Sequence, residues 1–473
     1  MRAPAQDLAD LSAGELASAF ATGACSPLEA LQAVHARIEA WEPTINALCH
    51  RNEDAERQAA AAGERWQAGR PLSPLDGVPV TVKEYIATAG VPTPLGSAAG
   101  VLTPAARDAP AAARLKEAGA VLVGKTTMPD FGMLTSGVST RNGTTRSPWN
   151  PAWNPGGSSS GAAAATVAGY GPIHIGTDIG GSVRLPGSFT GVVGHKPSFG
   201  RVPVSPPYYA RVAGPLTRTV ADAARAMAVL AQPDEVDFMS LPPQDIDWEN
   251  LEMDVAGVRV ALALEGGAGP ETDPEVAGAV RSAADALSDA GARVAQIRPL
   301  ITETMLTGLD RFWRVRSLRD LRALPPENQE RMLPYLRAWM EDAAGMSGLE
   351  LFEAFSQLEA ISIAARDAIS GFDYILSPVA PMATFSADLP SPGNDPARAL
   401  EHIAFTVTFS ISGHPAISVP WSTTADGRPI GIQLVGRRFA DAPVLALAVA
   451  CERLRGELPP WPQPPASRSQ PPA

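Results

Sequence analysis

The sequence has few cysteines and histidines, and it has no long hydrophobic run. Its three cysteines are scattered over 473 residues, which argues against a disulfide framework or a cysteine-based metal site. The six histidines form no HExxH or other paired spacing, so we expect neither a metal nor another cofactor. No stretch of about 18 apolar residues is present, and Asp7 and Asp10 stand where a signal peptide would be apolar. We therefore expect a cytoplasmic protein without a membrane contact.

Lysine is also scarce, because only Lys83, Lys116, Lys125 and Lys196 occur among 38 basic residues. Where arginine supplies almost all the positive charge, the retained lysines are enriched at places that need an amine able to lose its proton. The net charge is −12 and no basic block stands out, which argues against a nucleic-acid surface. We expect a small-molecule substrate, no nucleic acid as a partner, and a monomer or a homodimer.

Apolar strands and amphipathic helices alternate along most of the chain. Residues 78–82 form a β-branched run that ends at Lys83, and residues 120–126 form a second apolar run. The alternation is typical of an α/β protein with a central mixed, largely parallel twisted sheet covered by helices on both faces. Lys83 would then lie at the carboxyl end of a buried strand, where such sheets place functional side chains.

We expect a single catalytic domain over residues 1–458. Within it, residues 302–369 are helical in pattern, which predicts a helical cap over the sheet. Residues 459–473 are polar and rich in proline, which predicts a disordered tail.

Two serine-bearing glycine loops lie close together in the middle of the chain. The first, GGSSSG, covers residues 156–161, and the second, GTDIGGS, covers residues 176–182, with a small-residue helix and an apolar segment between them. Backbone N–H groups converge on a small negative charge only where the chain adopts conformations that a Cβ forbids. Glycines beside serines therefore predict an oxyanion hole next to a nucleophilic hydroxyl.

Ser159 is one possible nucleophile, because residues 157–161 match a G-x-S-x-G elbow with His402 or His414 downstream. An elbow follows a strand, however, and the segment PWNPAWNPGG before this serine has three prolines and cannot be a central strand. A phosphate-binding G-x-x-x-x-G-K-[ST] loop does not occur. The favoured interpretation has Ser182 as the nucleophile and a lysine as the final base.

The loops GGSSSG and GTDIGGSVRLP, with the lysine of PLDGVPVTVKE, make the sequence resemble the amidase signature family. The resemblance continues through GKTTMPDFGM, GHKPSFGRVP and PIGIQLVGRRF and covers roughly residues 8–454. It implies a Ser-Ser-Lys triad in which Ser182 forms the acyl-enzyme, Ser158 bridges and Lys83 is the base. It also implies a cis peptide bond between residues 157 and 158. The implied oxyanion hole consists of the backbone N–H groups of Ile179, Gly180, Gly181 and Ser182.

A lysine base must be neutral, whereas an ordinary lysine with a pKa of about 10.4 is mostly protonated at neutral pH. Burial lowers the pKa of a lysine. Neutral Lys83 would take a proton from Ser158 as Ser158 takes one from Ser182, and the relay would return the proton to the leaving nitrogen. Two positions differ from the family's common pattern: Glu84 stands in place of Asp, and Ser160 in place of a second glycine.

The predicted activity is hydrolysis of a carboxamide, or of a related aryl amide, ester or carbamate (urethane), through a seryl acyl-enzyme. The alternative is the glutaminase-type subunit of a transamidation complex, although GRVPVSPPYYARVAGPLTRT lacks the serine- and aspartate-rich run associated with that subunit. We expect apolar, loop-linked walls around the substrate. The residues expected to form them are Phe131, Gly132, Met133, Leu134 and Trp313.

Overall fold

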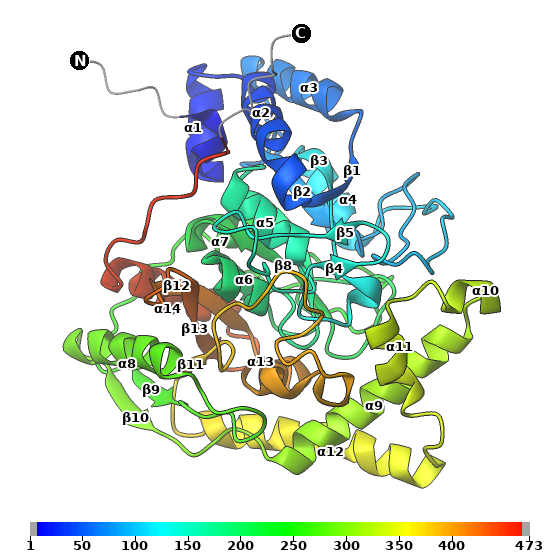
Figure 1. Cartoon of the computed structure of the whole chain (residues 1–473). Helices are drawn as coiled ribbons and strands as arrows, with labels where there is room; N and C mark the ends of the chain where they lie inside the picture. The colour runs from blue at the N-terminus through cyan, green and yellow to red at the C-terminus, as the bar shows by residue number, and fades with distance from the viewer. Residues whose placement is uncertain (1–6, 466–473) are drawn as a thin grey trace.

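The computed structural model describes residues 7–465 as an α/β fold around one large sheet (Figure 1). Its strands are β1 (Leu48–Arg51), β2 (Pro79–Lys83), β3 (Val121–Thr126), β6 (Ile173–Asp178), β7 (Val193–Lys196), β8 (Val212–Thr217), β9 (Arg259–Leu262), β10 (Arg293–Gln296), β11 (Tyr374–Pro378), β12 (Ala416–Thr423) and β13 (Pro429–Gly436). A separate small sheet pairs β4 (Val138–Ser139) with β5 (Gly143–Thr144).

The strand order of the large sheet is β1-β3-β2-β6-β8-β7-β12-β13-β11-β9-β10. The pairs within β3-β2-β6 and within β11-β9-β10 are parallel. In the part of the chain that the structure describes, the six other pairs are antiparallel. The predicted mixed α/β sheet is confirmed. Short connections such as the β12–β13 hairpin join antiparallel strands, whereas the parallel pairs need longer crossover connections.

The α-helices of the described residues are α1 (Ala13–Thr22), α2 (Pro27–Ile45), α3 (Ala55–Gln67), α4 (Pro110–Glu117), α5 (Ser160–Ala168), α6 (Arg184–Thr190), α7 (Val220–Leu230), α8 (Pro274–Asp289), α9 (Glu303–Arg322), α10 (Pro326–Gln329), α11 (Pro334–Glu341), α12 (Gly348–Ile369), α13 (Ala404–Ile411) and α14 (Asp441–Leu454). Short 3₁₀ turns are η1 (Leu8–Asp10), η2 (Asp130–Gly132), η3 (Pro396–Arg398) and η4 (Glu401–Ile403).

Helices cover both faces of the sheet, as the alternating pattern predicted. Helices α4, α7, α8 and α14 form neighbouring contacts over one face, and α2, α5 and α6 do so over the other. Successive side chains of a strand point to opposite faces. In β3, Val121 and Val123 join the core that contains residues of α2 and α5, while Leu122 joins the core that contains residues of α4 and α7.

The region predicted to be helical, residues 302–369, forms α9 to α12. In Figure 1 these helices lie at the end of the molecule opposite α1 to α3. Helix α9 packs against α11 and α12, and α12 packs against α13. Trp313 and Trp339 are buried in the core that these helices share with the sheet. The assignment of residues 1–458 to a single domain stays a prediction.

The tail predicted to be disordered falls partly outside the described residues, because these end at residue 465. Residues 459–465 form no helix or strand. The ring of Trp461 nevertheless lies 5.9 Å from the ring of Trp149, centroid to centroid, and the Arg218 guanidinium carbon lies 4.8 Å from the Trp461 ring centroid. Side-chain contacts thus hold the first part of this segment against the protein.

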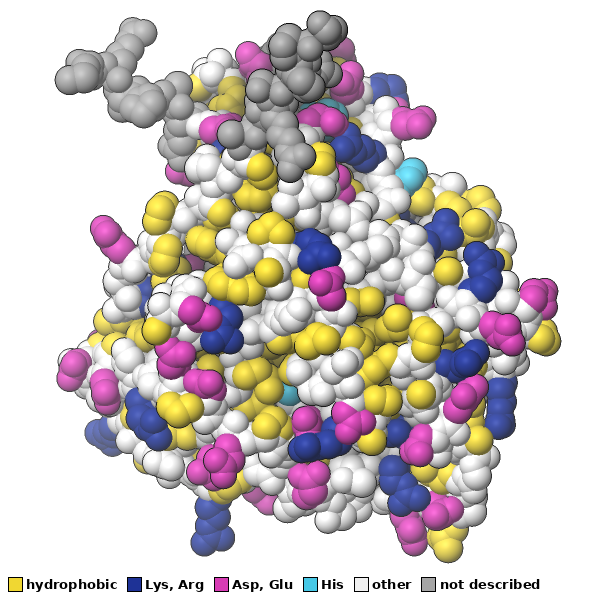
Figure 2. Space-filling model, viewed as in Figure 1, with side chains coloured by type: hydrophobic (Ala, Val, Ile, Leu, Met, Phe, Trp, Pro, Cys, Tyr) yellow, Lys and Arg dark blue, Asp and Glu magenta, His cyan; other side chains and the backbone are white. Residues whose placement is uncertain are grey.

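None of the helices within residues 7–465 is long and apolar enough to cross a membrane. On the face drawn in Figure 2, the Lys and Arg side chains are interspersed with Asp and Glu. The same residues contain no group of three or more His, Cys, Asp or Glu side chains placed to hold a metal ion. The cytoplasmic location stays a prediction.

Candidate active site

Lys83 is the last residue of β2, at the carboxyl end of the parallel β3-β2-β6 group. The apolar run before it forms the strand, and the Lys83 side chain is 1% exposed. Its Nζ donates to Ser158 Oγ at 2.8 Å, to Thr177 Oγ1 at 3.1 Å and to Ser159 Oγ at 3.2 Å. Thr177 belongs to the neighbouring parallel strand β6, so the sheet itself brings the amine and the threonine together.

Burial lowers the pKa of Lys83 to about 7, against a raising effect of Asp178 and a further lowering effect of Arg211. The neutral amine is therefore well populated near pH 7. Two other lysines are buried as well: desolvation lowers the pKa of Lys125 to about 8 and that of Lys196 to about 7. Three of the four lysines are thus buried and have a lowered pKa, and Lys83 is the one of them that contacts the two loop serines.

Ser158 and Ser159 lie in the glycine loop directly before α5. The peptide bond between Gly157 and Ser158 is cis, as the resemblance implies. Gly132 has a φ of 66°, and a Cβ at this position would lie 3.4 Å from Ser158 Oγ. Glycine at position 132 therefore permits the left-handed backbone and leaves space beside the hydroxyl.

The two serine loops meet at one small cavity. The Ser159 backbone N–H donates to the Ser182 carbonyl oxygen at 3.1 Å. Lys83, Ser158 and Ser182 all line the cavity, whose volume is about 20 Å³, roughly the room that one water molecule needs. No hydrogen bond joins the Ser182 and Ser158 hydroxyls among residues 7–465. The fold thus brings together the three side chains that the sequence analysis placed in one site.

A buried ion pair fixes the loop around Ser182. Asp178 Oδ1 accepts from the Gly181 N–H at 2.8 Å, and Asp178 Oδ2 accepts from the Val183 N–H at 3.1 Å. Arg184 Nη2 lies 3.0 Å from Asp178 Oδ1, and its Nη1 donates to Gln433 Oε1 at 2.7 Å. Asp178 and Arg184 therefore hold the backbone on both sides of Ser182 and connect it to strand β13.

The predicted oxyanion donors differ in their partners. The Gly181 N–H is engaged by Asp178, whereas the N–H groups of Ile179, Gly180 and Ser182 donate to no protein acceptor within the described part of the chain. A Cβ at Gly180 would lie 3.1 Å from Trp313 Cη2, so the indole ring covers this loop directly. Three of the four predicted donors thus have no protein acceptor among the described residues.

The expected pocket residues fall into two groups. Phe131, Gly132 and Met133 line the same cavity as the two serines. Leu134 and Trp313 are 5% and 3% exposed, belong to the surrounding hydrophobic core, and are not among the cavity-lining residues.

Asp130 anchors the loop that carries Phe131 to Met133. Its carboxylate accepts from the Thr140 N–H at 2.8 Å and from the Leu333 N–H at 3.1 Å. The second contact ties this cavity wall to the segment directly before α11. The wall is thereby connected to the helical region formed by residues 302–369.

The sequence analysis missed several residues around the cavity. The local motif GTDIGGSVR contains Thr177, Asp178 and Arg184, and two opposite charges that bracket a candidate nucleophile are a usable signal. Arg211 precedes β8 and Arg316 lies in α9, yet both line the cavity. They come from segments far apart in the chain, so no local pattern indicates that they meet.

The environment of Ser159 bears on the elbow alternative. Ser159 is fully buried, and its Oγ contacts Lys83 Nζ and the Thr177 backbone. His414 Nδ1 lies 2.8 Å from Ser412 Oγ, and His402 is buried with an unpartnered Nε2. Among the described residues, neither histidine forms a hydrogen bond with Ser159.

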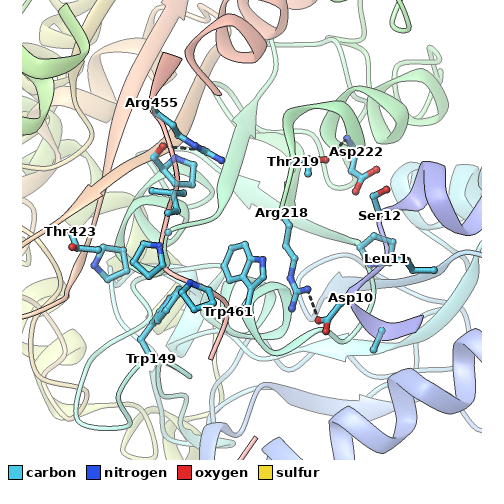
Figure 3. A pocket seen from close by; sticks show the side chains of 18 of the residues that line it. Asp10, Leu11, Ser12, Trp149, Arg218, Thr219, Asp222, Thr423, Arg455 and Trp461 are labelled. Atoms are coloured by element: carbon cyan, nitrogen blue, oxygen red, sulfur yellow. Dashed lines mark hydrogen bonds and ion pairs between the residues drawn. The ribbon is translucent and has the colours of Figure 1, made fainter. Parts of the chain in front are cut away.

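A second cavity, of about 600 Å³, lies away from these residues (Figure 3). Its wall includes Trp149, Arg218 and Trp461. Figure 3 shows Arg218 directed at Asp10, to which it forms an ion pair of 2.8 Å. Lys83, Ser158 and Ser182 do not line this cavity, so it is separate from the candidate active site.

Comparisons with known proteins agree with this fold. A family model described as Amidase matches residues 29–445. An acylamidase from Rhodococcus erythropolis is 34% identical over 470 residues, which cover 96% of this chain and 97% of the relative. A glutamyl-tRNA(Gln) amidotransferase subunit from Anaeromyxobacter sp. (strain K) is 36% identical over 501 residues, which cover 98% of this chain and 100% of the relative.

Two solved structures extend the likeness to three dimensions. A bacterial aryl acylamidase superposes with a TM-score of 0.87 at 28% identity, covering 94% of this chain and 96% of the other. A 6-aminohexanoate cyclic dimer hydrolase complexed with substrate superposes with a TM-score of 0.84 at 27% identity, covering 97% and 99%. Sequence and fold together define an enzyme that is an amide hydrolase or an amidotransferase. The chain belongs to the amidase signature family.

Proposed function

We propose that this protein hydrolyses linear carboxamides, including aryl amides, through an acyl-enzyme on Ser182. The contact that carries this proposal is the 2.8 Å hydrogen bond between Lys83 Nζ and Ser158 Oγ. Burial lowers the pKa of Lys83 to about 7, so a neutral amine is available there at physiological pH. Ser158 lines one cavity with Ser182 and is the natural bridge between the base and the nucleophile.

The proposed reaction has two halves. First, Lys83 takes the proton of Ser158 while Ser158 takes that of Ser182, and Ser182 Oγ forms a bond to the carbonyl carbon. The tetrahedral intermediate then breaks its C–N bond, and the relay returns the proton to the departing nitrogen. Second, water attacks the acyl-enzyme by the same proton path, which releases the carboxylic acid and restores Ser182.

We propose that the developing oxyanion is bound by the backbone N–H groups of Ile179, Gly180 and Ser182. Their lack of a protein acceptor among the described residues supports this assignment. The Gly181 N–H, assigned to the hole by the resemblance, instead holds the loop through Asp178. Fixed donors in a water-poor site stabilise the transition state because they need no reorganisation during the reaction.

A second candidate function is the glutaminase-type subunit of a transamidation complex. The 36% identity to a subunit of a glutamyl-tRNA(Gln) amidotransferase supports it. The two functions share the acyl-enzyme chemistry and differ in the substrate and in the fate of ammonia. Simple amides and glutamine, compared as substrates, therefore separate the two functions. A free-standing amidase hydrolyses simple amides without a partner.

The test uses purified protein with acyl anilides, primary amides, aryl carbamates and glutamine. We expect anilide or primary-amide hydrolysis that is lost in Ser182→Ala, and covalent labelling of Ser182 by a fluorophosphonate. Ser356→Ala, on α12 outside the cavity, is the control and should keep full activity. Labelling at Ser159 would instead support the elbow alternative. Hydrolysis of glutamine, without hydrolysis of the anilides, the other primary amides or the carbamates, would support the glutaminase-type function.

A further inference from the structure

Two arginine side chains stand in the wall of the candidate active site together with Ser158 and Ser182. Arg211 directly precedes β8 and is 9% exposed, and Arg316 lies in α9. Both guanidinium groups lie against the Tyr208 ring, with their central carbons 4.9 Å and 4.5 Å from its centroid. One tyrosine thus holds two cations at the cavity.

Arg211 has no carboxylate partner among residues 7–465. Its Nη1 donates to the Tyr85 hydroxyl, and its guanidinium carbon lies 4.6 Å from the Tyr85 ring centroid. Burial lowers the pKa of Arg211, two tyrosines oppose this effect, and the nearby Arg316 adds to it. A guanidinium still holds its proton at neutral pH. Among the described residues, the buried positive charge of Arg211 is therefore compensated only by the rings of Tyr85 and Tyr208 and by the Tyr85 hydroxyl.

Arg316 is only weakly paired. Its nearest carboxylate oxygen belongs to Asp320, at 3.8 Å, and Asp320 also pairs with Arg319. The Arg316 Nη1 lies 3.6 Å from Met133 Sδ, and its Nε is buried without a hydrogen-bond partner. Donors of Arg316 thus remain available at the cavity.

The carboxylate that lines the cavity does not neutralise these cations. Asp178 is committed to Arg184, whose side chain is fully buried with it. The cavity therefore has an excess of positive charge beside Ser182. An anionic group between the two arginines would relieve their repulsion and would satisfy the free donors.

We propose that Arg211 and Arg316 form an anion subsite that selects amides carrying a carboxylate. A guanidinium presents paired donors in the geometry of a carboxylate, so this anion suits the site. The carboxylate can reside on the acyl part or on the amine part of the amide. The inference rests on the proposed amide hydrolysis and adds a substrate class to it.

The experiment compares substrates matched in shape. For the acyl side, succinanilic acid is paired with 4-methylpentananilide, in which an isopropyl group replaces the carboxylate. For the amine side, 4-acetamidobenzoate is paired with 4-isopropylacetanilide. The quantity measured is kcat/KM of the carboxylate compound divided by that of its neutral partner. We expect a ratio well above one for the side on which the subsite lies, and no such preference for the other.

Two variants and a matched control test whether Arg211 and Arg316 cause the preference for the carboxylate substrate. Arg211→Gln and Arg316→Gln should each lower the ratio by on the order of 10- to 100-fold, as expected for a charge-assisted hydrogen bond. Arg316→Lys should keep part of it. Arg322→Gln removes the same charge from an exposed position at the end of α9, outside the cavity, and should leave the ratio unchanged. Equal ratios in the wild type and both Gln variants would overturn the subsite.

Binding separates this inference from the proposed function. Titration calorimetry with the Ser182→Ala variant measures succinanilate and 4-acetamidobenzoate against their neutral partners without turnover. Tighter binding of a carboxylate compound that Arg211→Gln abolishes supports the subsite, even if no anilide is hydrolysed and the proposed function fails. Hydrolysis of neutral anilides with no binding preference for the carboxylates leaves the proposed function standing and overturns the subsite.

Discussion

Asp178 and Arg184 form an ion pair across the loop that carries Ser182, and both side chains are fully buried. Burial alone would raise the pKa of Asp178, but Arg184 outweighs it and holds the pKa at about 2. The Asp178 carboxylate is therefore charged at neutral pH. Because Asp178 also accepts from the backbone on both sides of Ser182, the shape of the glycine loop depends on this pair.

The Arg184→Met variant should be strongly destabilised, because it leaves the Asp178 carboxylate buried without its partner. We expect the free energy of unfolding to fall by about 3–5 kcal/mol. The control, Arg366→Met, breaks the pair with Asp367, whose side chains are 69% and 61% exposed, and should cost less than about 1 kcal/mol. Urea denaturation at pH 7 measures both. Similar losses of unfolding free energy in the two variants would show that burial does not increase the contribution of the Asp178–Arg184 pair to stability.

Much of the site follows from local sequence. The apolar run before Lys83 indicates a buried strand, and the two glycine loops flank a helix of small residues. The grouping of Lys83, Ser158 and Ser182 in one site was implied by the resemblance to the amidase signature family. The contact with Thr177 depends on β2 and β6 being parallel neighbours. That pairing was implied by the α/β alternation, although the strand order was not.

Other parts were not predictable, for identifiable reasons. Strand β8 contains Gly214 and Pro215, which are unusual inside a strand, yet it lies in the middle of the sheet. Helix α2 continues through Pro43, where a proline normally ends a helix. The cluster of Arg211 and Arg316 depends on where α9 lies relative to the segment before β8. Periodicity identifies α9 as a helix but does not say which residues it brings to the cavity.

The pair Met133 and Leu134 separates substrate contact from core packing. Met133 lines the cavity, whereas its neighbour Leu134 is 5% exposed in the hydrophobic core. Met133→Ala should change the ratio of kcat/KM between long and short acyl anilides by severalfold with little change in stability. Leu134→Ala should lower the free energy of unfolding by about 2–5 kcal/mol and keep the substrate ratio. The prediction fails if Met133→Ala alters only the melting temperature.

Lys83 should act as a neutral amine, so Lys83→Arg should be nearly as damaging as Lys83→Ala. Arginine keeps a positive charge but does not lose its proton, so it cannot accept one from Ser158. We expect both variants to lose on the order of 10²- to 10⁴-fold in kcat/KM. Lys116→Arg is the control, because Lys116 lies outside the cavity and pairs with Asp108; it should keep full activity.

The pH dependence of the wild type tests the same role of Lys83. Burial lowers the pKa of its amine to about 7, and only the deprotonated form is a base, so kcat/KM should rise as the pH increases through about 7 and then level off. This rise should vanish in Lys83→Arg and Lys83→Ala, because neither side chain titrates there. Initial rates on a neutral anilide over pH 5–9 measure it. An Arg variant that stays active and keeps the rise would show that another group serves as the base for Ser182.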